Sequence, residues 1–270
     1  MQVVIPIGVG SNWENNELRY CLRSISKHCK FDVEPIILAE EGVSIPWLNN
    51  VVCVPITRFY PQGLEEKYGM KMYENYFDTS HKLKWFSEQD FCGDNFLWMY
   101  DDQLILQDIT DVQIFDNVAV GKSRSGRKSR HDRTIIQAMD ISHKEVHHNG
   151  LWISESHAPR YYNKAKLQRM FRCYPFETMD VPYALYTTYR NIYYDDPKSV
   201  IMDESCRLIC YYHFDDGTPH HQLPDTMGEI EDASKKYYVA NYTDKGLNAT
   251  GELLKRWIIS AYPDKCKYEL

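Results

Sequence analysis

The stretch "FLWMYDDQLIL" (96–106) contains the residues of this chain best suited to chemistry, the adjacent carboxylates Asp101 and Asp102. Apolar residues lie on both sides of the pair, so a buried strand is expected to end on two acids. Carboxylate oxygens are the ligands that Mg²⁺ and Mn²⁺ prefer. A divalent cation held here would bridge two phosphates of a nucleotide and neutralise the leaving group. The alternative interpretation is that the pair only forms a turn or caps a helix.

Apolar runs upstream of the pair predict the elements that position it. The runs at 3–7, 34–41 and 50–56 are expected to be strands, with a helix between the first two. Residues 64–92 are expected to be helical in part, and the strand at 96–100 follows. This order predicts half of a Rossmann-like, mostly parallel sheet, in which ligands bind beyond the carboxyl ends of the strands. The apolar face of the first helix comprises Leu18, Leu22, Ile25 and Cys29, and Asn15 or Asn16 is its expected cap.

The second half of the sequence is less regular. Strands are expected at 151–156 and 207–214, and amphipathic helices at 163–175 and 250–262. The segment 121–133 is polar and basic, so it is expected to be an exposed, mobile loop.

Length and composition indicate one domain. The chain has 270 residues, of which 43% are hydrophobic, and a formal net charge of -7. We expect a single α/β domain over 1–270, with a nucleotide-binding half at 1–110 and an acceptor-side half with the C-terminal helix at 111–270. The negative charge gives no indication of a general affinity for nucleic acid.

The location predicted from the sequence is cytoplasmic. No apolar stretch is long enough to cross a bilayer, and no basic segment precedes the apolar N-terminus as in a signal peptide. The eight cysteines form no CxxC pair. Without a secretion signal, reduced thiols in the cytoplasm are expected.

Neither of the two common phosphate-binding loops is present in the sequence. The stretch "GVGSNW" after the first strand has the wrong spacing for GxGxxG, and no GxxxxGK[ST] occurs. A metal ion and arginines are therefore the expected phosphate ligands.

An acid pair at a strand end, after a Rossmann-like first half, resembles the GT-A fold of nucleotide-sugar transferases. "MYDDQLIL" (99–106) is similar to the acid motif, often Asp-x-Asp, that holds a divalent metal on the donor's diphosphate in that fold. The two acids here are adjacent, which leaves open which carboxylate touches the metal. The resemblance implies a GT-A-like domain that uses a nucleotide-sugar donor with Mn²⁺ or Mg²⁺.

A narrower resemblance is to the Stealth family of sugar-1-phosphate transferases, with six matches in the same order. The chain departs from the family at "GVGSN", which lacks the acid of the family's "VDGSD", and at "TTYRN", which keeps one arginine of "SRFRS". The matching stretches are "NNELRYCLRSISKH" to "DELRYSLRS", "IPWLNN" to "IPSWLN", "FLWMYDDQLIL" to "FLYFNDDMFL", "SHAPRYYNKAKLQRMFRCYP" to the His-x-Pro segment, "TTYRN" to "SRFRS", and "RLICYYHFDD" to "FLCLNDD".

The resemblance implies roles for residues beyond the acid pair. His157 would act as an acid or base or bind phosphate, and Arg190 would clamp the diphosphate, because a guanidinium contacts phosphate oxygens in pairs. His213, or Asp215, would complete the metal shell. The structural alternatives are a core histidine for His157, a surface charge for Arg190, and a cap or turn for His213. The acceptor would be a glycan or another polymer, and transfer of a sugar or of a sugar 1-phosphate stays open.

The segment 121–133 carries six cations in an acidic chain. Its plainest interpretation is a solvated loop. A second is a lid that closes at Gly121 and Gly126, with Lys122 and Arg124 on the donor. A third is contact with a polyanionic acceptor, which predicts a nucleic-acid-binding protein or a DNA-modifying glycosyltransferase. An inactive transferase that keeps the fold is a further alternative. The cations are Lys122, Arg124, Arg127, Lys128, Arg130 and Arg133.

Overall fold

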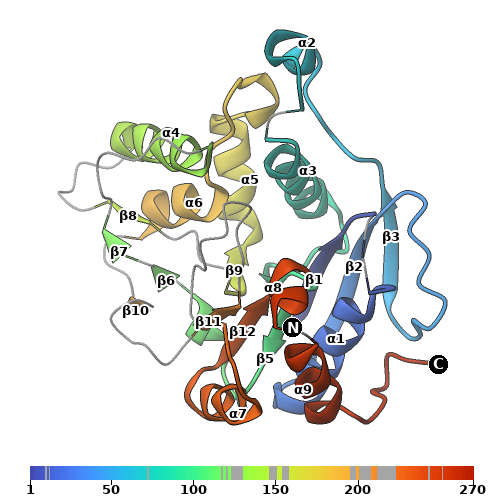
Figure 1. Cartoon of the computed structure of the whole chain (residues 1–270). Helices are drawn as coiled ribbons and strands as arrows, with labels where there is room; N and C mark the ends of the chain where they lie inside the picture. The colour runs from blue at the N-terminus through green and yellow to red at the C-terminus, as the bar shows by residue number, and fades with distance from the viewer. Residues whose placement is uncertain are drawn as a thin grey trace.

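A five-stranded sheet is the main element of the fold (Figure 1). The computed structural model describes residues 1–270 except 10, 12, 72, 117, 120, 123–129, 146–150, 154–157, 195–198, 201–207, 212–222, 243 and 251. The first four strands of the sheet are parallel and the fifth is antiparallel. This confirms the predicted α/β class and mostly parallel, Rossmann-like sheet. The strand order is β3 (Val52–Ile56), β2 (Glu34–Glu40), β1 (Gln2–Ile7), β4 (Asn95–Trp98) and β9 (Arg160–Asn163).

Each proline of this sheet lies where a hydrogen-bonded neighbour is missing. Pro6 lies beyond Val4, the last residue of β1 that pairs with β4. Pro35 lies before Ile36, the first residue of β2 that pairs with β3. Pro55 belongs to β3, which is an edge strand. Proline has no backbone N–H to donate to a neighbouring strand. At these positions no such donor is needed on the unpaired side, so the strands tolerate it.

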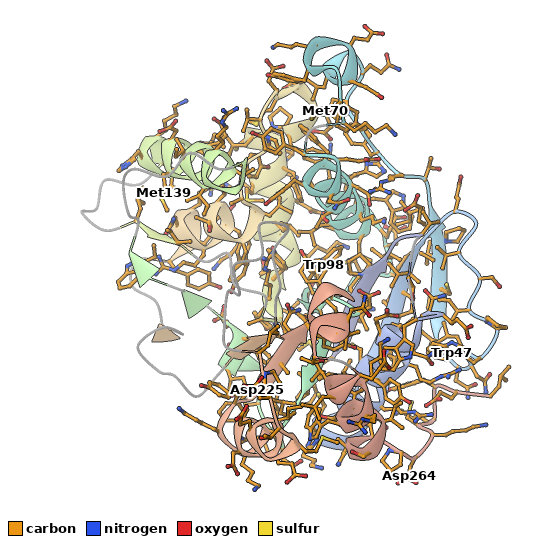
Figure 2. All side chains as sticks on the ribbon, in the orientation of Figure 1. Trp47, Met70, Trp98, Met139, Asp225 and Asp264 are labelled. Carbon is orange, nitrogen blue, oxygen red and sulfur yellow. The ribbon has the colours of Figure 1, made fainter. Side chains whose placement is uncertain are left out.

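Alternating residues of β4 build a separate core on each face of the sheet. Leu97 packs with α1 (Asn16–His28), whereas its neighbours Phe96 and Trp98 pack with α3 (Glu74–Glu88). Trp98, labelled in Figure 2, lies in the interior of the molecule. A strand buried on both faces has apolar residues at successive positions, which explains the continuous apolar run that precedes the acid pair.

The helices predicted from apolar periodicity are present. The stretch 64–92 contains α2 (Leu64–Tyr68) and α3. α5 (Lys164–Cys173) and α9 (Leu253–Ala261) lie within the two other predicted helical stretches, and α5 buries its apolar face as expected. Asn15, one of the two expected caps of α1, is the N-cap residue. Its side chain makes no capping hydrogen bond, so that part of the prediction is wrong. No helix in the described part of the chain is long and apolar enough to cross a membrane.

A second, three-stranded sheet continues directly from β4. β5 (Gln103–Ile105) pairs antiparallel with β12 (Val239–Tyr242), and β12 pairs parallel with β11 (Leu208–Tyr211). Helices α7 (Met227–Lys236) and α9 pack on this sheet around a third apolar cluster. Only the residues between β4 and β5 separate the two sheets, so the acid pair lies at their junction.

The segment 121–133 is not a loop throughout. It begins with β7 (Gly121–Lys122), which pairs with β8 (Trp152–Ile153), and Arg130 is the first residue of α4 (Arg130–Glu145). Arg130 and Arg133 are therefore helical residues, whereas residues 123–129 lie outside the described residues. The remaining elements are η1 (Val112–Phe115), β6 (Val118–Ala119), η2 (Phe176–Thr178), α6 (Leu185–Tyr193), β10 (Ser199–Val200) and α8 (Asp244–Ala249).

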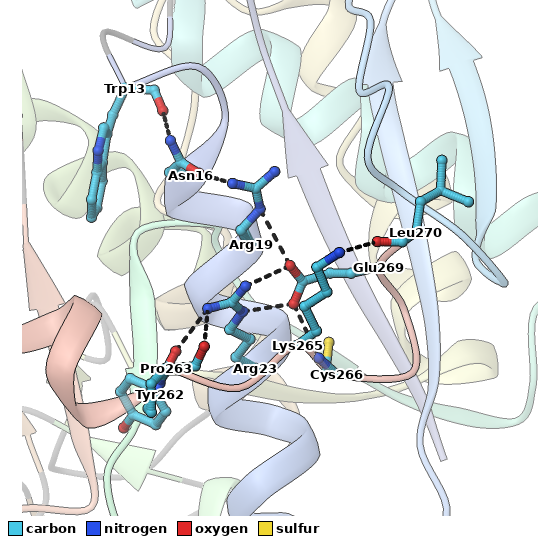
Figure 3. A network of polar contacts seen from close by, with 10 residues as sticks. All are labelled: Trp13, Asn16, Arg19, Arg23, Tyr262, Pro263, Lys265, Cys266, Glu269 and Leu270. Atoms are coloured by element: carbon cyan, nitrogen blue, oxygen red, sulfur yellow. Dashed lines mark hydrogen bonds and ion pairs between the residues drawn. The ribbon is translucent and has the colours of Figure 1, made fainter.

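The C-terminal tail is fixed on α1 by an ion-pair network (Figure 3). The guanidinium of Arg23 donates to both carboxylate oxygens of Glu269, at 2.6 and 2.7 Å, and Nε of Arg19 lies 3.4 Å from the same carboxylate. The Arg19 guanidinium also stacks 4.6 Å from the ring of Trp47, and the backbone N–H of Leu270 donates to the Trp47 carbonyl at 2.9 Å. The first two stretches that resemble the Stealth family thus meet at the tail and stabilise the fold there.

A Glu269→Gln substitution should lower the free energy of unfolding by about 1–2 kcal/mol at pH 7. Burial, the largest single effect, raises the pKa of Glu269, but the hydrogen bonds from Arg23 and Cys266 and the charge of Arg23 together outweigh it, and the net pKa lies below the ordinary value. Such a carboxyl stabilises the fold above its unfolded-state pKa of about 4.3, and this contribution is lost as the pH falls through the folded-state pKa. Urea denaturation of wild type and variant at pH 7 and pH 3 measures it. If the free energies of unfolding of wild type and variant differed by the same amount at both pH values, the stabilisation would not come from the ionised carboxylate of Glu269.

Candidate functional site

The acid pair forms the central residues of a tight turn between β4 and β5. The backbone N–H of Gln103 donates to the carbonyl of Tyr100 at 3.2 Å, and the Gln103 side chain accepts from the Tyr100 N–H at 2.9 Å. Gln103 is fully buried, so the turn is fixed from inside. The interpretation of Asp101 and Asp102 as turn residues is therefore correct. It is compatible with ligand binding, because the turn presents two carboxylates at the end of a strand.

The turn lies where the strand order of the main sheet reverses. β1 has β2 on one side and β4 on the other. The backbone N–H of Met99 donates to the carbonyl of Val4 at 3.0 Å, which holds the end of β4 against β1. Ligands of open α/β sheets bind at such a switch point, outside the carboxyl ends of the strands. The acid turn and the carboxyl end of β1 therefore define the candidate site.

Asp102 is oriented by the second sheet. The side-chain nitrogen of Asn241 donates to Oδ1 of Asp102 at 2.9 Å and to its backbone carbonyl at 3.3 Å. The backbone N–H of Tyr242 donates to the same carbonyl at 3.1 Å. Burial, followed by the charge of Asp101, raises the pKa of Asp102 well above its ordinary value, against the effect of the hydrogen bond from Asn241. A carboxyl in this position is stabilised in its charged form by a bound cation.

A third carboxylate, that of Glu17, adds negative charge at the site, and its charge also raises the pKa of Asp102. Glu17 lies in the first turn of α1, is 6% exposed, and accepts from the Ser11 hydroxyl at 2.7 Å. The same hydroxyl oxygen accepts the backbone N–H of Asn15 at 2.8 Å, which closes the loop after β1. The acid therefore occupies the helix end where a dinucleotide fold places its pyrophosphate. This agrees with the lack of a GxGxxG motif and favours a cation over a bare anion.

A buried ion pair lies at the end of β1. Nζ of Lys82 lies 2.7 Å from Oδ2 of Asp78 and donates to the carbonyl of Ile7 at 3.3 Å. Oδ1 of Asp78 accepts the backbone N–H of Phe59 at 3.2 Å. The sequence analysis did not single out this pair, and its only sequence signal is the spacing of four residues within a helix. Lys82 brings a positive charge to the strand next to the acid turn.

Arg160 lies beside the acid turn, although the sequence analysis gave it no role. It is the first residue of β9 and lies opposite Trp98, the last residue of β4. Its guanidinium lies 5.7 Å from the ring of Tyr100 and 5.9 Å from the ring of Tyr186, and it is 6% exposed as a residue. Because Tyr100 directly precedes the acid pair, Arg160 is a second cation at the candidate site. Its only sequence signal is its position directly after His157 and Pro159 in the stretch that resembles the His-x-Pro segment.

Arg190, predicted to clamp the diphosphate, is wholly buried in α6. Its guanidinium donates to Oδ1 of Asn191 at 2.9 Å. The same oxygen accepts the backbone N–H of Trp152 at 3.2 Å, which links α6 to β8. The alternative of a surface charge is therefore wrong. The contact with a donor stays a prediction.

An Arg190→Lys substitution should lower the free energy of unfolding by roughly 2–4 kcal/mol, because an ammonium cannot reproduce a buried planar guanidinium. Urea denaturation measures this, with Arg169→Lys on the exposed face of α5 as the matched control. Donor binding is measured in parallel. Normal stability with weakened donor binding would favour the diphosphate clamp, and a variant normal in both would contradict both roles.

Of the other predicted site residues, the structure places only Lys122. His157, Arg124, His213 and Asp215 lie outside the described residues. Lys122 is a residue of β7 in the small β7–β8 sheet. Their roles in catalysis, donor binding and metal binding stay predictions.

The acids of the turn suit a metal that is shared with a substrate. In the described part of the chain, no group of three or more histidine, cysteine, aspartate or glutamate side chains is arranged to hold a metal ion. Mg²⁺ and Mn²⁺ are often held by one or two carboxylates, with waters and substrate phosphates as the other ligands. Asp101 and Asp102 fit this second arrangement, since a cation offsets two adjacent negative charges of which one is desolvated.

Comparison with known proteins gives a distant structural likeness and no family. No family model matches the chain, and no curated protein matches it. A crystal structure of the galactosyltransferase LgtC with donor and acceptor sugar analogs is similar with a TM-score of 0.49 and 12% identity, covering 99% of this chain and 98% of that one. An active-site mutant of LgtC gives a TM-score of 0.48 and 14% identity, covering 95% of this chain and 96% of that one. At these values the reaction of LgtC is not carried over to this chain, and the resemblance to the Stealth family stays a prediction from motifs.

Proposed function

We propose that this chain is a divalent-metal-dependent transferase whose donor is a nucleotide sugar. The observation that supports the proposal most is the turn with Asp101 and Asp102 at the switch point of the sheet, where Glu17 adds a third negative charge. A site of this kind favours a cation, and a cation on two carboxylates has positions left for the oxygens of a diphosphate. The GT-A resemblance of "MYDDQLIL" agrees with this use of the acids.

Each described residue of the site has a part in donor binding. Asp101 and Asp102 hold the metal, and Asn241 orients Asp102. Arg160 stabilises the negative charge that develops on the leaving phosphate, and Lys82 supplies positive charge from the end of β1. The metal, when bound, neutralises charge on the leaving group.

The remaining site residues are predictions from the sequence: Lys122 and Arg124 come from the basic segment 121–133, and the others from the motif resemblance. His157 acts as an acid or base at the reacting centre or binds phosphate. Arg190, Lys122 and Arg124 contact the donor. His213, or Asp215, is a further metal ligand.

Two transfer reactions fit the same donor site, and they break different bonds. Glycosyl transfer breaks the bond between the anomeric carbon and oxygen and releases a nucleoside diphosphate. Transfer of a sugar 1-phosphate breaks the phosphoanhydride and releases a nucleoside monophosphate. The Stealth resemblance favours the second reaction, with a glycan or another polymer as acceptor.

The experiment that tests the proposal is incubation with a panel of sugar nucleotides and Mn²⁺, followed by identification of the nucleotide released. Parallel reactions contain EDTA or an Asp101→Asn variant. We expect one donor to be consumed only with metal and only by wild type. Release of a diphosphate or a monophosphate decides between the two reactions. Consumption that persists in EDTA and in the variant would overturn the metal assignment.

The nucleic-acid alternative has no observation in its favour. It rests on the segment 121–133, and residues 123–129 of that segment lie outside the described residues. The acids of the turn would repel a phosphate backbone that approached them without a cation.

A further inference from the structure

Asn241 of β12 has one side-chain atom that the acid turn does not use. The residue is fully buried, and its side-chain nitrogen donates to Oδ1 and to the backbone carbonyl of Asp102. Both atoms of Asp102 are acceptors, so chemistry requires the nitrogen of the amide to face them. The amide oxygen then points elsewhere, and it is a buried acceptor without a hydrogen-bond partner among the described residues.

An unpaired buried oxygen of this kind needs a physical reason. Leaving a buried polar group unsatisfied costs about 1–3 kcal/mol, and most buried polar groups in proteins are paired. The unpaired oxygen belongs to β12, the strand whose Asn241 fixes Asp102, and it lies next to the candidate metal site. A bound cation accepts electron pairs from oxygen and would therefore remove this energetic cost.

The surroundings of Asn241 are rich in acids. The hydroxyl of the next residue, Tyr242, is also buried and has no hydrogen-bond partner in the part of the chain that the structure describes. Asp102 contacts Asn241 directly, and the carboxylates of Asp101 and Glu17 bring further negative charge to the site. The species that suits this cluster of oxygens is a small cation.

We propose that the amide oxygen of Asn241 is a protein ligand of the divalent cation that the acid turn takes. The inference rests on the proposed metal site and extends it to a residue outside every stretch that carries the GT-A or Stealth resemblance. Amide oxygens are ordinary ligands of hard divalent cations, alongside carboxylates. The cation would then join the turn after β4 to the second sheet through residues 139 positions apart in the sequence.

The competing explanation is that Asn241 acts only as a positioning residue through its N–H groups. Two substitutions separate the explanations. Asn241→Asp keeps a side-chain oxygen but loses the N–H donors. Asn241→Leu is similar in size and loses the oxygen as well as the N–H donors. If the oxygen binds metal, Asn241→Asp binds Mn²⁺ at least as tightly as wild type, and Asn241→Leu binds it at least 10-fold more weakly. If only the N–H groups matter, both variants lose affinity, and the aspartate loses more because it repels Asp102.

The measurement is the dissociation constant of Mn²⁺ alone, from the paramagnetic resonance signal of free Mn²⁺, together with the shift of Tm that Mn²⁺ causes. Circular dichroism checks that each variant folds. If Asn241→Leu does not fold, Asn241→Asp still decides, because weakened Mn²⁺ binding by this variant overturns the proposal. Wild-type affinity in Asn241→Leu also overturns it.

An Asp101→Asn variant distinguishes failure of this inference from failure of the proposed function. If wild type binds Mn²⁺, Asp101→Asn does not, and Asn241→Leu binds it normally, only the role of Asn241 is wrong. If wild type itself takes up no Mn²⁺, the metal site and the role of Asn241 are both overturned.

Discussion

An Asp101→Asn variant is expected to bind a nucleoside diphosphate on the order of 100-fold more weakly than wild type in the presence of Mn²⁺. The amide removes a charge with little change of volume. Asp101 is a central residue of a turn that the backbone and Gln103 hold in place, and it retains some solvent exposure. The fold should therefore be unchanged. Calorimetry with the uridine, cytidine, adenosine and guanosine diphosphates in turn, with and without Mn²⁺, measures the loss.

Two further variants control for the removal of a charge. Asp264→Asn changes an exposed acid of the C-terminal tail, labelled in Figure 2, and should leave binding unchanged. Asp102→Asn removes a carboxyl whose pKa burial raises, so it should lower Mn²⁺ affinity without lowering stability in EDTA. Equal Mn²⁺-dependent affinity in wild type, Asp101→Asn and Asp102→Asn would exclude the acid turn as the metal site.

An Asp78→Ala substitution is expected to lower the free energy of unfolding by roughly 3–5 kcal/mol. The side chains of Lys82 and Asp78 are only 3% and 10% exposed, and the carboxylate also holds the backbone N–H of Phe59. Removing it leaves a buried ammonium without a counter-charge and a backbone donor without an acceptor. Urea denaturation at pH 7 gives the value.

The double variant Asp78→Leu/Lys82→Met tests whether the uncompensated charge is the cause. It should recover most of the stability, since replacing both members of a buried pair by apolar residues is often near neutral. The exposed pair Lys235–Asp232 is the control, where Asp232→Ala should change stability by less than about 0.5 kcal/mol. A loss for Asp78→Ala no larger than the loss for Asp232→Ala would show that the buried pair does not stabilise the fold.

The first half of the fold was predictable because its signals are local. Continuous apolar runs marked β1, β2, β3 and β4, and apolar periodicity marked α1 and α3. β1, β2 and β4 are buried on both faces, which produces such runs and indicated a parallel sheet, whereas β3 is an edge strand and mostly exposed. In the second half, the elements that were not predicted include β9, β12, α4, α6 and α7. β9 and β12 have four residues each, and periodicity in so short a segment is ambiguous. The helix α4 begins inside the basic segment 121–133, and that segment was interpreted as a loop because of its charge.

The sequence by itself determined the acid pair, because two adjacent carboxylates between apolar runs are visible without any knowledge of distant contacts. Only the tertiary structure decided which groups surround the pair. Glu17 comes from the loop and helix after β1, Arg160 from an antiparallel strand, and Asn241 from a strand of a second sheet. Each of these residues is an ordinary polar residue in its own segment. Its relation to the turn arises from strand order and register, which long-range packing fixes and local residue patterns do not encode.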